Sequence, residues 1–141
     1  MTEITFYTFA DNPLDVARRV AVKAHGQGKQ VMIYAPDPAV ADAIDRLLWT
    51  TPALGFVPHC RDGDTLANET PMLIGADADA LRTADVMINL HTEQPAAFAR
   101  FERLVEIIGQ DDAGREQGRA RYRFYQARGY ALKTHDLRQT G

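Results

Sequence analysis

The chain has 141 residues, of which 45% are hydrophobic and 25% charged, and its formal net charge is −3 at pH 7. This length and composition predict a single globular domain, residues 1–141, with a core of its own. No apolar run approaches the roughly 18 residues that cross a bilayer, and the N-terminal residues lack the features of a signal peptide. The lone cysteine, Cys60, excludes an internal disulfide and a cysteine cluster for zinc, so we expect a cytoplasmic protein.

The charge is unevenly distributed along the chain. Residues 111–141 carry seven basic and four acidic side chains, whereas residues 1–110 carry nine basic and fifteen acidic ones. Within the basic part, the stretch GRARYRFYQARGY (118–130) combines four arginines with four aromatic rings. A positive end on an acidic protein predicts an anionic partner for that end.

The first half of the chain alternates between strand and helix patterns. Residues 4–9 are β-branched and aromatic, which is typical of a strand. Residues 12–28 have apolar side chains at helical spacing, with a proline near the start and glycines at the end. Residues 30–35 form a short apolar run, as expected of a strand buried on both faces. Asp37 is a suitable N-cap for a second amphipathic helix over residues 38–49.

The middle of the chain has weaker patterns. Residues 50–70 are irregular, and the short apolar runs at 71–76 and 85–90 then predict two further strands. The stretch QPAAFARF, from residue 94, starts like a helix. The β-rich run LVEII at 104–108 predicts another strand.

The C-terminal part completes an alternating order of elements. Residues 115–128 are predicted to form a helix that ends with Gly129 at the C′ position, and residues 130–137 an edge strand or tail. Short apolar strands that alternate with amphipathic helices predict an α/β fold. We expect a Rossmann-like, three-layer α/β/α architecture with a mostly parallel sheet.

Motifs that carry chemistry in open α/β sheets are missing from this sequence. The turn after the first strand contains no glycine, which excludes the Rossmann and P-loop fingerprints there. The stretch HGQGK (25–29) follows a helix, so we interpret it as a helix-to-strand turn. No histidine has an i+3 or i+4 partner suited to a metal, and the neighbours His59 and Cys60 should point in opposite directions. We therefore predict no catalytic residue, no metal and no cofactor.

The predicted C-terminal helix gathers positive charge on one side. At about 100° per residue, Arg115, Arg119, Tyr122 and Arg123 fall within roughly one 100° arc. The apolar end of the preceding strand, at Ile108, should lie near the start of this helix. Guanidinium groups bind carboxylates bidentately, so a cationic groove with an apolar floor suits a partly hydrophobic peptide with a free carboxyl end.

Two other interpretations of this helix stay open. Its arginines could form an ordinary solvated face, or they could bind single-stranded nucleic acid with Tyr122 as a stacking platform. Three arginines make a small footprint for DNA, and the acidic remainder of the chain would repel a long polyanion. Peptide binding is therefore favoured on physical grounds.

A second unusual stretch, LLWTTPALGFVPH (47–59), contains the only tryptophan. Trp49 closes the second predicted helix, and Phe56 follows it among prolines. These rings either fill the space between loop and sheet or act as anchors of a protein-binding surface. The two candidate surfaces lie far apart in sequence, which would let one protein hold two partners.

Several motifs occur in the order found in a known family. They are TFY near the N-terminus, LLWTTPALGFVPH, DVMINL, FERLVEII and RARYRFYQARGYALKTH. In these motifs the chain resembles the chi subunit of bacterial DNA polymerase III over nearly its full length. Residues 61–84 match poorly, and nothing is inferred from them.

The resemblance implies a non-catalytic adaptor. Chi subunits bind the acidic, phenylalanine-ending C-terminal tail of single-stranded DNA-binding protein, and they pair with the psi subunit, which ties them to the clamp loader. Contact with DNA would be mainly indirect. The family's tail-binding positions fall on Arg115, Arg119, Tyr122, Arg123 and Ile108, and its psi-facing aromatic positions fall on Trp49 and Phe56. Arginine replaces lysine at 115 and 123, which keeps the charge but implies a changed geometry.

Two alternatives from other function classes accompany this interpretation. One is a nucleotide-binding, Rossmann-like enzyme that uses the carboxyl edge of the sheet, and a nucleotide would then raise the melting temperature. The other is a direct binder of single-stranded DNA. It would retard an oligonucleotide in a gel without any other protein, whereas an adaptor would need the DNA-coating protein.

Overall fold

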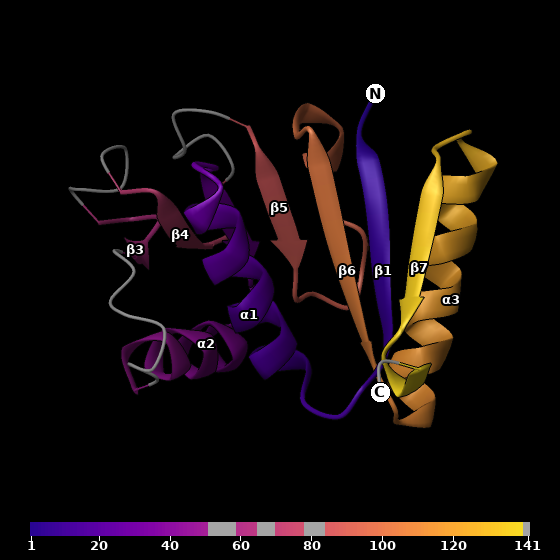
Figure 1. Ribbon diagram of the computed structural model, residues 1–141, viewed down its shortest axis with the longest axis horizontal. Helices are drawn as coiled ribbons and strands as arrows, with labels where there is room; N and C mark the ends of the chain where they lie inside the picture. Colours follow the sequence, from indigo (N-terminus) through magenta and orange to yellow (C-terminus); the bar gives the residue numbers. More distant parts are fainter. Residues whose placement is uncertain (51–58, 65–69, 78–83, 140–141) are drawn as a thin grey trace.

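The computed structural model describes residues 1–50, 59–64, 70–77 and 84–139 (Figure 1). Its centre is a seven-stranded sheet with the order β3-β4-β2-β5-β6-β1-β7. The strands are β1 (Glu3–Ala10), β2 (Val31–Tyr34), β3 (Cys60–Arg61), β4 (Met72–Gly75), β5 (Val86–Asn89), β6 (Arg103–Gly109) and β7 (Leu132–Asp136). All pairs among these described strands are parallel, which confirms the predicted α/β fold.

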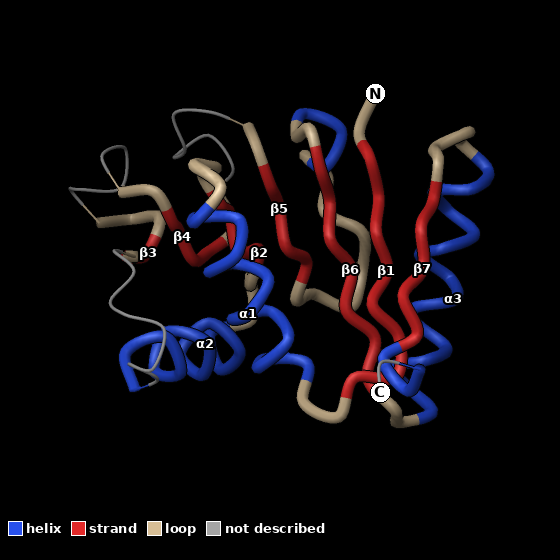
Figure 2. Tube along the Cα trace, in the orientation of Figure 1, coloured by secondary structure: helices blue, strands red, loops and turns tan. Residues whose placement is uncertain are grey.

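Helices cover both faces of the sheet. Figure 2 shows α1 (Pro13–Gly26) and α2 (Pro38–Thr50) on one face and α3 (Asp112–Ala127) behind the other, next to β7. Residues of α1 and α2 share one apolar cluster, and Tyr125 of α3 belongs to a second. Two short 3-10 helices, η4 (Phe98–Arg100) and η5 (Leu137–Gln139), complete the described elements. The predicted three-layer architecture is therefore confirmed.

The first two helices begin as the sequence predicts. Pro13 occupies the first turn of α1, and the side chain of Asn12 accepts a hydrogen bond from the backbone N–H of Asp15 at 3.3 Å. Before α2, the carboxylate of Asp37 accepts the N–H of Ala39 at 2.9 Å. Each cap satisfies a donor that the helix itself leaves without a partner.

The ends of α3 are defined by an N-cap and a glycine. The carboxylate of Asp111 accepts the N–H of Gly114 at 2.9 Å, so the helix begins at Asp112, three residues earlier than predicted. Gly129 has φ +83, and its N–H and that of Tyr130 donate to carbonyls of the last helical turn. This is a Schellman motif, and it confirms the predicted C′ glycine.

Three other segments refine the sequence prediction. The stretch from residue 94 forms only the 3-10 turn η4, because Phe98 and Phe101 both pack into the core and one turn is enough to bury them. The end of the chain, predicted as an edge strand or tail, is the edge strand β7, paired in parallel with β1. The part expected to be irregular contributes the two-residue strand β3.

Strand β6 lies between the two apolar clusters. Val105 and Ile107 join the cluster beneath α1 and α2, whereas Leu104 and Ile108 join the cluster beneath α3. This alternation follows from the two-residue period of a strand, and it explains why a parallel strand appears as a continuous apolar run. The one charged residue in the run, Glu106, faces α3.

The connections that follow β1 and β6 run to opposite faces of the sheet. These two strands are neighbours, but β1 leads into α1 on one face and β6 leads into α3 on the other. In open parallel sheets such a switch point leaves a crevice at the carboxyl ends of the strands, where ligands usually bind. A ligand site is therefore expected at the carboxyl ends of β1 and β6.

Candidate functional site

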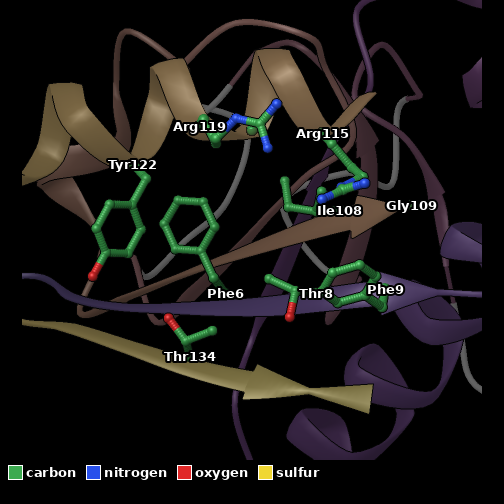
Figure 3. Close-up of a pocket in the computed structure, with 10 residues that line it drawn as sticks. Phe6, Thr8, Phe9, Ile108, Gly109, Arg115, Arg119, Tyr122 and Thr134 are labelled. Carbon is green, nitrogen blue, oxygen red and sulfur yellow. The ribbon is translucent and has the colours of Figure 1, made fainter. Parts of the chain in front are cut away.

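A pocket of about 220 Å³ lies between α3 and the C-terminal halves of β1, β6 and β7 (Figure 3). We call it the α3 pocket. Its lining residues are Phe6, Thr8, Phe9, Ile108, Gly109, Arg115, Gly118, Arg119, Tyr122 and Thr134. Rings and an isoleucine form its floor, and guanidinium groups from α3 stand at its rim.

The floor of the α3 pocket consists of side chains that are held by the core. Phe6 and Ile108 are both buried, and the rings of Phe6 and Tyr122 meet edge to face with centroids 5.2 Å apart. Gly118 lets α3 come close to β6, because a Cβ at this position would lie 2.5 Å from Cδ1 of Ile108. A glycine inside a helix thus has a packing role here. The floor is apolar and fixed before any ligand arrives.

The rim of the pocket carries two arginines in different surroundings. Arg115 is half-buried, and its Cζ lies 5.1 Å from the centroid of the Phe9 ring. Arg119 is more exposed and pairs with Glu116 at 3.0 Å, where both side chains are more than half exposed. Exposed pairs of this kind contribute at most about 1 kcal/mol. A ligand carboxylate could therefore replace Glu116 at little cost.

The structure brings together most of the residues predicted for this site. Ile108, Arg115, Arg119 and Tyr122 all line the α3 pocket. Arg123 is exposed on the same helix but does not line the pocket. It extends the positive surface beyond the rim, so two of the three predicted arginines lie at the pocket.

Several residues that line the α3 pocket were not predicted from the sequence, because most of them belong to no local pattern that indicates a site. Phe6, Thr8, Phe9 and Thr134 reach the pocket only because β1 lies between β6 and β7, an order that cannot be read from local patterns. Gly118 did give a signal, since glycine is unfavourable inside a helix unless close packing requires it.

A buried polar cluster fixes α3 to the sheet. Glu106 has no exposed surface, and its carboxylate accepts hydrogen bonds from Arg121 at 2.9 Å, from Tyr125 at 2.6 Å and from Asn89 at 2.9 and 3.1 Å. Arg121 also donates to the carbonyl of Thr92 at 2.6 Å. The carboxylate on β6 thus binds both β5 and α3, and Arg121 joins α3 to the loop at Thr92. We refer to these side chains as the Glu106 cluster.

Burial controls the protonation behaviour of this cluster. Loss of solvation raises the pKa of Glu106, and the charge of Arg121 and the hydrogen bonds from Tyr125 and Asn89 oppose that rise. The pKa of Tyr125 is also raised, by burial first and by the neighbouring Glu106 charge second, so its hydroxyl remains a donor. Tyr125 and Asn89 both donate hydrogen bonds to the Glu106 carboxylate, so the cluster is a structural support and not a reactive site.

The second predicted surface lies at the other end of the sheet. Trp49, at the end of α2, is 56% exposed, and its ring centroid lies 4.8 Å from that of His59. The imidazole of His59 is buried, and its Nε2 lies 3.1 Å from the carboxylate of Asp45. Phe56 lies outside the described residues. Helices α2 and α3 are at opposite ends of the molecule in Figure 1.

In the described part of the chain, no group of three His, Cys, Asp or Glu side chains is placed to hold a metal ion. None of its helices is both long and apolar enough to span a membrane. The turn at 25–29 joins α1 to β2, as predicted, with Gly28 at φ +80.

Comparison with known proteins gives consistent matches along the whole chain. The model of the family described as DNA polymerase III chi subunit, HolC, matches residues 1–133. A protein of Pseudomonas aeruginosa named DNA polymerase III subunit chi is 34% identical, with 97% of this chain and 98% of that protein covered. Proteins of the same name from Haemophilus influenzae and Escherichia coli are 30% and 28% identical, covering 94% and 82% of this chain and 95% and 79% of their own lengths. The chain therefore belongs to the DNA polymerase III chi subunit family.

Proposed function

We propose that this chain is a non-catalytic subunit of the replicative DNA polymerase III complex and binds the acidic, phenylalanine-ending C-terminal tail of single-stranded DNA-binding protein. The α3 pocket is the binding site, and a second surface around Trp49 and Phe56 binds the psi subunit, which links the chain to the clamp loader. The observation that carries the proposal is an apolar pocket with two guanidinium groups at its rim.

The chemistry of the α3 pocket fits a chain end that is both aromatic and charged. A terminal phenylalanine ring can lie against Phe6, Tyr122 and Ile108, where edge-to-face contacts and burial stabilise it. Its carboxylate then meets the guanidinium of Arg119, with Arg115 beside it, and a charge-assisted hydrogen bond forms. Neither feature alone would select the free C-terminus of a protein.

The surroundings of the pocket favour acidic residues upstream of that terminus. Arg123 and Lys133 are exposed on α3 and β7, two of the elements that form the pocket. Long-range attraction of this kind raises the association rate and weakens as salt increases. We therefore assign Arg123 a steering role and not direct contact with the terminal carboxylate.

The test is a calorimetric titration of the whole chain with an acidic peptide ending in Pro-Phe and with its C-terminally amidated twin. We expect the free acid to bind more tightly, because amidation removes the charge that Arg119 and Arg115 recognise. Arg119→Ala should cost about 2 kcal/mol of binding free energy, or about 30-fold in Kd, as loss of a charge-assisted hydrogen bond does.

The matched control for this titration is Arg46→Ala. Arg46 is exposed on α2, on the other face of the sheet, so this substitution changes the net charge equally without touching the pocket. Equal affinity of the wild-type chain for the acid and the amide would contradict the proposal. So would an Arg119→Ala variant that binds the acid as tightly as the wild type.

The proposed psi surface has a separate test. Trp49→Ala should abolish co-purification with psi and leave the tail affinity unchanged, because Trp49 and the α3 pocket belong to opposite ends of the sheet. A variant that keeps psi would contradict the assignment. Loss of both partners would point to a folding defect, which a melting curve detects.

A further inference from the structure

Phe9 has a backbone conformation that aromatic residues avoid. Within the described part of the chain it is the only non-glycine residue with a positive φ, at +59. It lies where the pairing of β1 with β6 shifts register, between Tyr7 and Ala10. Such a conformation costs free energy and persists only where the surrounding contacts impose it. The contacts of its side chain are therefore of interest.

Phe9 lines two cavities. One is the α3 pocket, and the other is a cavity of about 310 Å³ that Phe9 lines together with Arg19, Gln110 and Arg138. Figure 3 shows the Phe9 ring at the end of the α3 pocket opposite Tyr122, so the ring bounds the pocket at that end.

Two guanidinium groups lie against this ring. The Cζ of Arg138 is 3.4 Å from the ring centroid, and that of Arg115 is 5.1 Å away. Both distances are within the range of a cation–π interaction. Figure 3 shows Arg115 next to Phe9 at the end of the pocket opposite Tyr122. The ring therefore connects an arginine of the rim to an arginine of the C-terminal segment.

Arg138 is itself held in place by a neighbour on β7. Its Nη2 and Nε donate to the two carboxylate oxygens of Asp136, at 2.6 and 3.0 Å, and its backbone N–H donates to the same carboxylate at 2.9 Å. A bidentate pair fixes the plane of the guanidinium, which a single contact would not do. Arg138 lies beyond residues 1–133, to which the family model extends.

We propose that Arg138 and Phe9 are positioning residues of the α3 pocket: Arg138, oriented by Asp136, holds the Phe9 ring as the end wall, and the ring orients Arg115 toward the ligand's terminal carboxylate. The inference rests on the proposed function, because that carboxylate belongs to the tail peptide. The C-terminal segment that carries Asp136 and Arg138 thus contributes to the binding site.

The Phe9 ring is the contact that orients the Arg115 guanidinium. Among the described residues, no carboxylate lies within ion-pairing distance of Arg115, whereas Arg119 has Glu116. An unpaired, half-buried guanidinium beside an apolar pocket is available to a ligand. The ring keeps it near the pocket without neutralising it.

The experiment separates positioning from simple charge. Arg138→Ala and Asp136→Asn change the net charge in opposite directions, so an electrostatic effect would weaken binding of the acidic peptide in the first and strengthen it in the second. Positioning predicts weaker binding in both, by about two- to fivefold, as expected for loss of one cation–π contact. The amidated peptide should be little affected, because it lacks the carboxylate that Arg115 meets.

A third variant tests the wall itself. Phe9→Gly removes the ring without straining the backbone, because glycine readily adopts φ +59, and it enlarges the α3 pocket at the Phe9 end. We expect the preference for a terminal phenylalanine over a terminal tryptophan to shrink by about fivefold or more. Melting temperatures of all three variants show whether each is folded.

The outcomes distinguish this inference from the proposed function. If the wild-type chain binds neither peptide, the proposed function fails and this inference fails with it. If the wild type binds the acid but both Arg138→Ala and Asp136→Asn bind it unchanged, only the positioning role is wrong. The same conclusion follows if Asp136→Asn binds more tightly than the wild type.

Discussion

Helix α3 makes two ion pairs of the same chemistry in opposite environments. Arg121 and Glu106 are 2.9 Å apart, with side chains 6% and 0% exposed, whereas Arg119 and Glu116 are 3.0 Å apart, with side chains 55% and 69% exposed. Water screens the second pair but not the first. The first pair therefore fixes the helix, and the second can be exchanged for a ligand at little cost.

The geometry of a helix allows one segment to serve both purposes. Arg119 and Arg121 are two residues apart, so they project about 200° from each other around the axis. The side toward β5 and β6 carries the Glu106 cluster, and the side toward β1 and β7 forms the rim of the α3 pocket. Two residues of the same type, two positions apart, thus have different functions.

The largest expected effect follows from breaking the buried pair. Arg121→Ala leaves the Glu106 carboxylate buried without its charged partner, which costs about 3–5 kcal/mol of unfolding free energy. Urea unfolding measures this loss. Arg128→Ala is the matched control, because Arg128 is exposed at the C-terminal end of the same helix, where its Cζ lies 3.6 Å from the centroid of the Phe124 ring. A loss no larger than that of the control would mean that the cluster does not fix α3.

A smaller effect is expected when the cluster loses one neutral donor. Tyr125→Phe keeps the ring contacts with Phe6 and Phe98 but removes the hydroxyl that donates to Glu106 at 2.6 Å. The cost should be about 1–3 kcal/mol, since a buried acceptor loses one of its partners. The same urea titration measures it. An unchanged unfolding free energy would show that the remaining donors satisfy the carboxylate by themselves.

The sequence predicts the exposed side of α3 better than the buried one. Helical periodicity places Arg115, Arg119 and Tyr122 together, and the short loop before α3 brings Ile108 to them, so local patterns suffice. Arg123 belongs to the same arc but does not line the pocket, because it projects about 40° beyond Arg119 and about 100° from Tyr122 around the helix axis. The lining residues of α3 therefore occupy a narrower part of the arc than the sequence predicts.

The Glu106 cluster could not be predicted in the same way. Its members come from β5, β6 and α3, and they meet only because β5 and β6 are neighbours beneath this helix. One local signal did exist: Glu106 interrupts the apolar run LVEII. A carboxylate inside a buried strand requires partners, although the sequence does not say which residues supply them. The fold class could be predicted because it depends on repeated local patterns. The Glu106 cluster could not be predicted, because it depends on contacts between residues that are far apart in the sequence.

The smallest effect on stability, and the sharpest test of the comparison, comes from the exposed pair. Glu116→Gln should change the unfolding free energy by no more than about 0.5 kcal/mol, because the pair is screened by water. It should raise the affinity for the free-acid peptide about two- to fourfold, since Arg119 no longer has a competing carboxylate. Glu102→Gln is the control: Glu102 is also 69% exposed, pairs with Lys29 at 3.8 Å and lies away from the pocket. If both variants gain the same affinity for the free-acid peptide, net charge governs binding and the release of Arg119 does not.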